Sequence, residues 1–134
     1  MDPHVNFAYA LVAVAPIPAS SGTSLTITSG LGSLFPATSP IIAFNAVVWP
    51  VNTKASILNA EFVRVTTRSG DVFTILRAQE SSNARVIVVG DQIALTVTAK
   101  TFKDIEDEIA AEAVTRASAD TADRLSAIAM AVVL

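Results

Sequence analysis

The sequence contains no cysteine and only one histidine, His4. Without cysteine the chain can form neither a disulfide framework nor a thiolate metal site. A metal or catalytic role for His4 would need partner residues at defined spacing, and the sequence shows none. Serine is plentiful, but no Gly-x-Ser-x-Gly or Ser-x-x-Lys motif occurs. We therefore expect no catalytic residue, no cofactor and no metal, and hence no enzyme.

Glycine is also scarce, with five residues among 134. The glycines are scattered, so no glycine-rich loop of the kind that cradles phosphate groups is present. Basic residues form no stripe either: residues 1–100 carry six basic and five acidic groups, and residues 101–134 carry three and seven. Because nucleic-acid binding needs a basic surface, this distribution argues against a nucleic-acid partner.

Long apolar runs are missing too. Residues 5–15 and 127–134 are apolar, but both are far shorter than the roughly 20 residues of a membrane span. Asp2 stands where a signal peptide would carry basic residues. We expect no membrane association and a chain made in the cytoplasm.

Apolar side chains are what the sequence has in excess. They make up 51% of the chain, and the mean hydropathy is +0.54. A domain of this size has too much surface to hide so many apolar residues, so this composition favours self-association.

The first hundred residues have the pattern of short strands. Apolar and β-branched residues alternate or run in short blocks, and turn residues such as Ser69-Gly70-Asp71 and Gly90-Asp91 separate them. Pro40 and Pro50 bracket one block, which fits an edge or terminal strand better than a central one. The predicted strands are residues 5–15, 24–28, 41–49, 61–68, 72–76, 85–89 and 92–99. We expect a mainly β domain over residues 1–100, either an antiparallel β-sandwich or a small barrel.

The period changes at residue 101, where a helical segment, residues 101–134, is expected. Thr101 and Asp104 resemble a capping box, and no glycine or proline follows. We predict one long helix from about residue 102 to at least residue 130. Two pairs, Glu112–Arg116 and Asp120–Arg124, have the acid four residues before the base, which is the favourable order.

Two apolar stripes run along this helix. One steps by four and three residues, which is typical of a coiled coil, and the other is out of phase by two residues, or about 200° around the helix. The consecutive acids Glu106, Asp107 and Glu108 point around the helix, so they indicate a solvated face. We predict that the first stripe is an oligomer seam and that the second packs on the β domain. The seam residues are Val114, Ser118, Thr121, Leu125, Ile128 and Val132, and the packing residues are Phe102, Ile105 and Ile109.

Three polar or aromatic residues of the β domain have two interpretations each. Arg77 and Glu80 flank a connection, where we expect a structural ion pair rather than a sugar or ligand contact. Trp49 is expected in the core or at a subunit interface, although an exposed tryptophan would suit carbohydrate stacking.

Several short motifs occur in a definite order and spacing along the first 108 residues. They are His4-Val5-Asn6-Phe7-Ala8-Tyr9, Leu34-Phe35-Pro36, Phe44-Asn45-Ala46-Val47-Val48-Trp49-Pro50, Ala60-Glu61-Phe62-Val63-Arg64-Val65-Thr66, Arg77-Ala78-Gln79-Glu80, Ala84-Arg85, Val89-Gly90-Asp91-Gln92-Ile93 and Asp104-Ile105-Glu106. With these motifs the chain resembles, over most of residues 4–108, the N-terminal virion-attachment module of tailed-bacteriophage tail fibre, tailspike and baseplate-associated proteins. The module usually continues with Gly-Thr where this chain has Ser81-Ser82. Residues 113–123 are similar to the Ala/Asp/Arg coiled coils of trimeric phage fibres.

The resemblance implies a structural protein of the phage virion. Its N-terminal module would dock on tail or baseplate proteins, and its helix would form a homotrimeric coiled coil. Receptor binding or glycan hydrolysis would belong to C-terminal fibre domains, so the chain is either the anchor of a longer fibre or a short adaptor. Two alternatives are a head- or neck-attached fibre or baseplate adaptor, and a carbohydrate-binding adhesin module.

Overall fold

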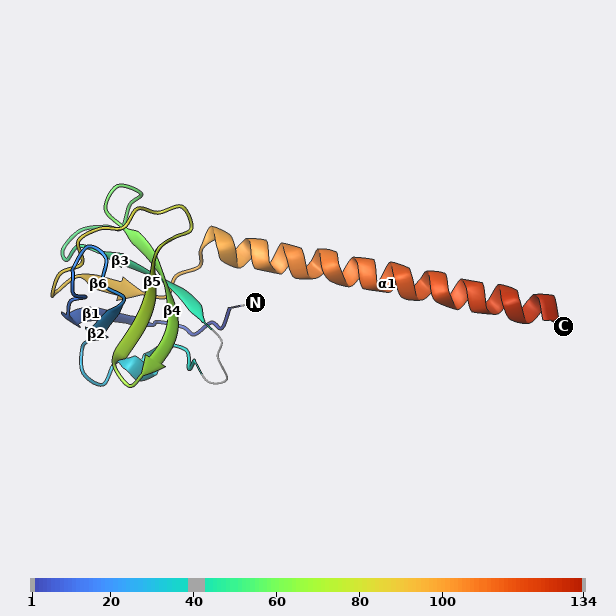
Figure 1. Cartoon of the computed structure of the whole chain (residues 1–134), viewed down its shortest axis with the longest axis horizontal. Coiled ribbons are helices and arrows are strands. Elements are labelled where there is room, and N and C mark those ends of the chain that lie inside the picture. Colours follow the sequence, from blue (N-terminus) through green and yellow to red (C-terminus); the bar gives the residue numbers. More distant parts are fainter. Residues whose placement is uncertain (1, 39–42, 134) are drawn as a thin grey trace. The chain divides into compact units, whose positions relative to one another are not determined.

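The computed structural model describes residues 2–38 and 43–133. Within them the chain forms two compact units, a β unit of residues 2–98 and a helical unit that begins at Ala99. Figure 1 labels the elements. They are β1 (Tyr9–Val14), β2 (Ser24–Ile27), the 3-10 helix η1 (Gly32–Leu34), β3 (Phe44–Trp49), β4 (Glu61–Ser69), β5 (Val72–Gln79), β6 (Gln92–Ala94) and α1 (Ala99–Val133).

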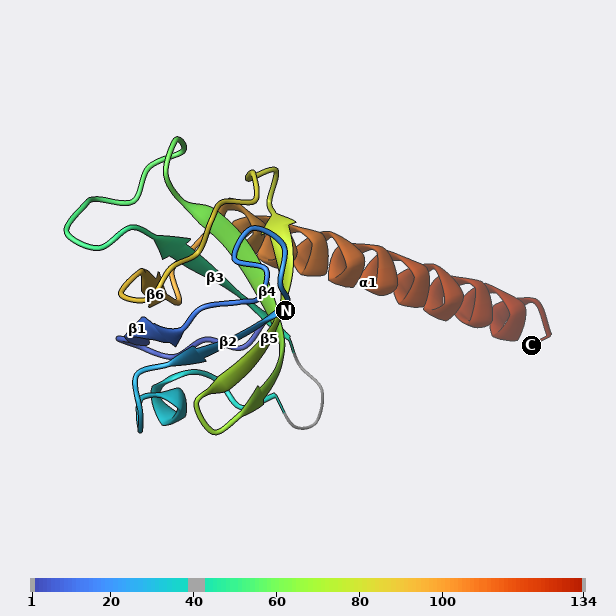
Figure 2. The same ribbon diagram turned by 60° about the vertical axis from the view of Figure 1, so that its left-hand side comes forward.

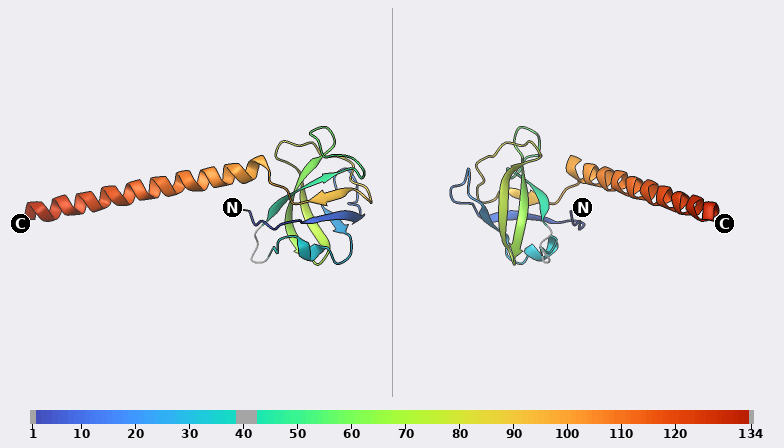
Figure 3. Two further views of the ribbon diagram at one scale, coloured as in Figure 1. Left: turned by 180° about the vertical axis from the view of Figure 1, so that it is seen from behind. Right: turned by 45° about the vertical axis from the view of Figure 1, so that its right-hand side comes forward.

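The β unit is a closed antiparallel barrel of six strands, in the order β1-β2-β5-β4-β3-β6. Figures 2 and 3 show the strands curving around one closed sheet. Of the two expected architectures, the small barrel is therefore confirmed. The edge-strand prediction for residues 41–49 is wrong, because β3 pairs with β4 on one side and with β6 on the other. Residues 41 and 42 of that predicted strand lie outside the described residues.

The barrel interior is filled by the inward-facing residues of the alternating strands. Three phenylalanines from distant segments, Phe35, Phe44 and Phe73, pack at ring-centroid distances of 5.1 to 6.3 Å. Aromatic rings contribute large buried areas, so this cluster is a major part of the apolar burial that stabilises the barrel. The other members of this core cluster are Ala8, Ala10, Val12, Leu25, Ile27, Ala46, Val48, Val63, Val65, Ile75, Ile87 and Ile93.

Some strand boundaries differ from the sequence prediction for identifiable reasons. The first strand begins only at Tyr9, because Phe7 has a φ of 60° and turns the chain. Residues 85–89 form no regular strand, since their amide groups bond elsewhere: Arg85 donates to a Glu61 carboxylate oxygen and Val88 to an Asp91 carboxylate oxygen. The last strand is shorter than predicted, covering only β6.

The long helix of the prediction is confirmed as α1, with 35 residues. It begins at Ala99, so Thr101 lies inside its first turn and the predicted capping box is wrong. Both predicted ion pairs form, with nitrogen–oxygen distances of 2.7 Å for Arg116–Glu112 and 3.0 Å for Arg124–Asp120. Among the described residues, no helix is both long and apolar enough to cross a membrane.

Candidate functional site

The most completely buried charge in the barrel is Glu61, at the start of β4. Its side chain has no exposed surface and forms an ion pair with Arg77 of β5, in which the guanidinium Nε and Nη2 atoms each lie 2.7 Å from a carboxylate oxygen. The backbone amides of Ala78 and Arg85 donate to the same carboxylate, both at 2.9 Å. The predicted Arg77–Glu80 pair is therefore wrong: the bulged pairing of β4 with β5 brings Glu61 to Arg77 instead.

The electrostatics of Glu61 match those of a structural ion pair. Burial raises the pKa of its carboxyl, but hydrogen bonds from Arg77 and from the Arg85 and Ala78 amides outweigh burial and lower the pKa below its ordinary value. Arg77 also donates to the carbonyl oxygens of Ala19, Gly22 and Arg85. All these hydrogen bonds are internal to the barrel, so the pair ties the β1–β2 and β5–β6 connections to the sheet.

Glu80 belongs to a second network, on the side of β4 that faces away from the core. Its carboxylate accepts hydrogen bonds from Asn45 and from Thr98, both at 2.8 Å. Asn45 in turn accepts from Arg64, which forms an ion pair with Asp2 at 2.8 Å. The network thus joins the N-terminal segment, β3 and β4 to the residue that immediately precedes α1.

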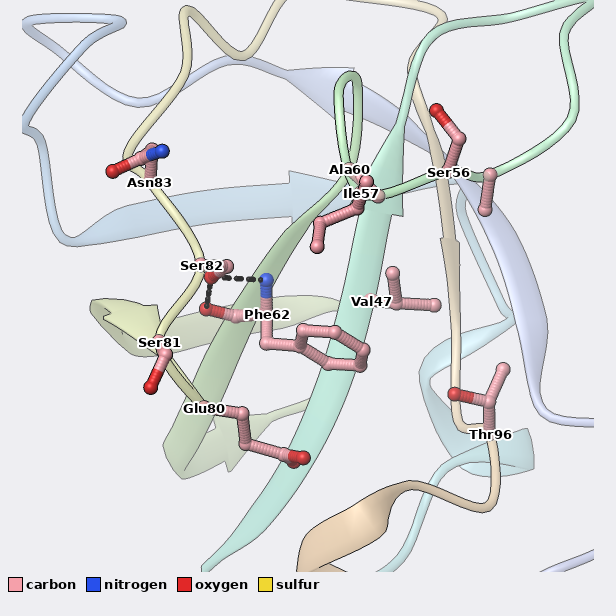
Figure 4. A pocket seen from close by; sticks show the side chains of 11 residues that line it. Val47, Ser56, Ile57, Ala60, Phe62, Glu80, Ser81, Ser82, Asn83 and Thr96 are labelled. Carbon is pink, nitrogen blue, oxygen red and sulfur yellow. Dashed lines mark hydrogen bonds between the residues drawn. The ribbon is translucent and has the colours of Figure 1, made fainter.

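A pocket of about 540 Å³ opens on the outer surface of β3 and β4. We call it the β3–β4 pocket. Figure 4 shows the side chains of Val47, Ile57 and Phe62 converging in it, whereas Ser81 and Asn83 point away. Its complete lining is Val47, Ala55, Ser56, Ile57, Ala60, Phe62, Glu80, Ser81, Ser82, Asn83 and Thr96.

Trp49 lies on the barrel surface, where it is half-buried, so the core interpretation of this residue is wrong. Its ring is 6.4 Å from that of Tyr9, and its indole N–H donates to the carbonyl oxygen of Thr53. Tyr9 donates to the side chain of Gln92 in β6. The two aromatic residues therefore stand on β1 and β3, the strands that flank β6.

No described residue of α1 is buried. Along the predicted seam, the four apolar side chains are exposed in the single chain, and the two hydroxyls bond to their own helix: Ser118 donates to the Val114 carbonyl and Thr121 to the Ala117 carbonyl. The second stripe, Phe102, Ile105 and Ile109, lies on the same helix and is also exposed there. Its packing on the barrel, like the burial of the seam in an oligomer, stays a prediction.

Two further features bear on chemistry. Within residues 2–38 and 43–133, no group of three or more histidine, aspartate or glutamate side chains is placed to hold a metal ion. In the same residues, every buried side-chain nitrogen or oxygen has a hydrogen-bond partner. The buried polar groups are thus satisfied by the fold itself.

Two residues that the sequence patterns did not single out have unusual positions. Glu61 shares the period-two inward face of β4 with Val63 and Val65, and a charged residue in that register signals a buried partner. Phe7 combines a positive φ with an almost fully exposed ring, and no sequence pattern marks it.

Comparison with known proteins does not assign this chain to a family. No protein-family model matches the sequence, and no curated protein gives a significant match.

Proposed function

We propose that this chain is a structural subunit of a tailed-bacteriophage virion, whose barrel docks on tail or baseplate proteins and whose helix forms a homotrimeric coiled coil. The observation that carries the proposal is α1 itself. No described residue of this 35-residue helix is buried in the single chain. Most helices in proteins owe their stability to tertiary packing, so α1 requires a partner surface.

The chemistry of the seam supports sister helices as that surface. Charged residues of the later part of α1, such as Arg116, Asp120, Asp123 and Arg124, fall outside the seam positions. The hydroxyls of Ser118 and Thr121 are already bonded within the helix. Burying these two side chains between helices would therefore leave no hydroxyl group without a hydrogen-bond acceptor. The two polar seam residues are thus compatible with an interface that excludes water.

The heptad positions favour three or four helices over two. The step of three residues from Leu125 to Ile128 makes Leu125 an a position and Ile128 a d position. Leucine at a with isoleucine at d shifts coiled coils toward trimers and tetramers. Together with the resemblance to phage fibre modules, this arrangement supports the trimer. At 1.5 Å per residue, α1 would give a stalk about 50 Å long.

A matched pair of variants tests the seam. Ile128 and Met130 are exposed to similar degrees in the single chain, 60% and 69%, but they are two residues apart and so face nearly opposite ways. Light scattering at micromolar concentration should give three times the 14.0 kDa chain mass for the wild type and for Met130→Asp. Ile128→Asp should give a smaller mass and weaker helical circular dichroism. A monomeric wild type would contradict the proposal.

The virion assignment needs its own measurement. Immunogold labelling of intact phage particles that carry the chain should place it at the tail or baseplate. Label at the head or neck would instead support the head- or neck-attached alternative, and unlabelled particles would contradict a virion role.

Carbohydrate binding is a second candidate because Tyr9 and Trp49 form an aromatic pair at the barrel surface. Such rings stack on the apolar faces of sugars. A glycan array probed with the full chain should give specific binding that Trp49→Ala abolishes if this function is present. In the leading proposal, the wild type binds no glycan.

A further inference from the structure

Phe7 presents its side chain to solvent in a way that the single chain does not explain. The residue is 95% exposed and has a φ of 60°. Both features are unfavourable, since a bulky L residue avoids the left-handed region and an aromatic ring avoids water. Strained backbone conformations cluster at binding and active sites. Phe7 therefore has the properties of an anchor for an interface.

The β3–β4 pocket is the matching hollow on the same barrel. Part of its polar lining is engaged within the chain: the Ser82 hydroxyl accepts from the Phe62 amide and donates to the Gln79 carbonyl, and Glu80 accepts from Asn45 and Thr98. The side chains of Ser81 and Asn83 point away from the hollow (Figure 4). The converging walls are apolar, which suits an apolar side chain (Figure 4).

The order of the strands places this anchor and this pocket on opposite sides of β6. Phe7 precedes β1, which is one neighbour of β6, and the pocket lies on β3, the other neighbour, and on β4. The amide of Leu95 bonds to the carbonyl of Ala8, so the segment after β6 continues beside the start of β1. Residues 95–98 alone separate the end of β6 from the start of α1.

A threefold assembly built on α1 would use that arrangement. If three helices gather on one axis, the short connection of residues 95–98 keeps β6 of each barrel close to that axis, where one flank of β6 can meet the other flank in a neighbouring copy. Each contact then joins one kind of surface to another, and such head-to-tail contacts close into a ring when the rotation is threefold.

We propose that Phe7 of one copy inserts into the β3–β4 pocket of the next, against Val47, Ile57 and Phe62, so that three barrels close a ring at the base of the stalk. This inference rests on the proposed trimer and adds a second interface to it. The occupant of the pocket is a second copy of this chain.

A cross-linking experiment tests the contact directly, because the chain contains no cysteine. The full-length Phe7→Cys/Ile57→Cys double variant changes two almost fully exposed side chains, so the fold should be retained. After mild oxidation, a non-reducing gel should show a covalent trimer. Each single variant should give at most a dimer, because it offers only one thiol per chain.

A second variant keeps the proposal testable if the introduced thiols lie too far apart to join. Phe7→Gly removes the exposed ring and relieves the positive φ, so the melting temperature of the dissociated chain should not fall. The concentration at the midpoint of trimer dissociation should rise about tenfold or more, as expected when an aromatic anchor is lost. Ile17→Ser is the matched control, since Ile17 is another highly exposed apolar residue, at the far end of β1.

The outcomes separate this inference from the proposed function. A monomeric wild type refutes the trimer, and the ring with it. If the wild type is trimeric, the ring is still refuted when the double variant gives no covalent trimer and Phe7→Gly dissociates at the same concentration as the wild type. The trimer then stands without the ring. An internal disulfide that leaves the double variant at monomer mass, with unchanged dissociation of Phe7→Gly, likewise overturns the ring and leaves the trimer standing.

Discussion

Removing the carboxylate of Glu61 should destabilise the barrel more than any other single loss of charge in the chain. The Glu61→Ala variant eliminates four hydrogen bonds, two from Arg77 at 2.7 Å and two from the Ala78 and Arg85 amides at 2.9 Å. The Arg77 guanidinium, whose side chain is only 9% exposed, would remain in place without its counter-charge. A buried charge that loses its partner is costly because water cannot replace the lost interaction.

The magnitude follows from that burial. Breaking a buried ion pair by removing one partner costs about 3–5 kcal/mol. Domains of this size are stable by about 5–15 kcal/mol, so the variant should lose a large share of the total. An exposed pair of equal length provides the control. Glu112–Arg116 in α1 has the same 2.7 Å separation, yet Glu112→Ala should cost less than about 1 kcal/mol because water screens it.

Urea unfolding followed by tryptophan fluorescence is the appropriate assay. Trp49, in β3, is the only tryptophan, so its emission reports on the barrel and not on α1. The reasoning would be refuted if Glu61→Ala lost less than about 1 kcal/mol, or no more than Glu112→Ala. A double variant, Glu61→Ala/Arg77→Met, should recover part of the loss, because it removes the unpaired charge as well.

The acid stability of the barrel has the same origin. The pKa of Glu61 is lower in the folded chain than its ordinary value, so the folded state binds fewer protons there than the unfolded state. Its contribution to stability is therefore fully present above the ordinary pKa and is lost as the pH falls through the lowered folded value. Urea midpoints measured from pH 7 down to pH 3 should fall less in Glu61→Ala than in the wild type, because the variant lacks the Glu61 contribution and keeps those of the other carboxylates.

Three further predictions concern turns. Gly32→Ala should destabilise the barrel by at least about 2 kcal/mol in urea unfolding, because its Cβ would lie 2.0 Å from the Gly70 carbonyl oxygen; wild-type stability would contradict this geometry. Ser81→Gly should raise the unfolding free energy by about 0.5–1 kcal/mol, since relief of its φ of 61° exceeds the added chain entropy; a loss would contradict the strain. Asp71 has a lowered pKa because the amides of Gly30 and Gly32 donate to it, so its stabilisation is present above the ordinary pKa and lost below the folded one. Asp71→Asn should therefore unfold more easily at pH 7 and lose less on acidification, and a parallel pH profile would exclude this role.

The features that could be predicted from the sequence are those that local patterns determine. The β4–β5 hairpin follows from alternating residues on either side of Ser69-Gly70-Asp71, and Gly70 has the positive φ that such a turn requires. The helix follows from its period and from the absence of glycine and proline. The ion pairs of α1 could be predicted as well, because spacing along a helix determines which side chains meet.

The features that were missed depend on contacts between distant segments. Arg77 was expected to pair with Glu80, three residues away, but the bulges between β4 and β5 set the register that brings Glu61 to it. Residues 85–89 have the composition of a strand, yet the Glu61 and Asp91 carboxylates take amide groups that a ladder would use. When a side chain from a distant segment accepts the backbone amide hydrogen bonds that a neighbouring strand would otherwise accept, a short stretch of the sequence does not reveal it.

The surplus of apolar residues connects the fold to the proposed assembly. The barrel core accounts for the inward faces of the strands, but no described residue of α1 is buried, and Leu125, Ile128, Met130 and Val132 are all exposed in the single chain. On the barrel, Phe7 is the exposed apolar residue that most calls for a partner, since its side chain is exposed and its backbone has a positive φ. Seam burial alone would cover Leu125, Ile128 and Val132 but not Met130 or Phe7. If an assembly covers all of them, the contacts proposed between barrels would cover Phe7, and Met130 would need a further surface.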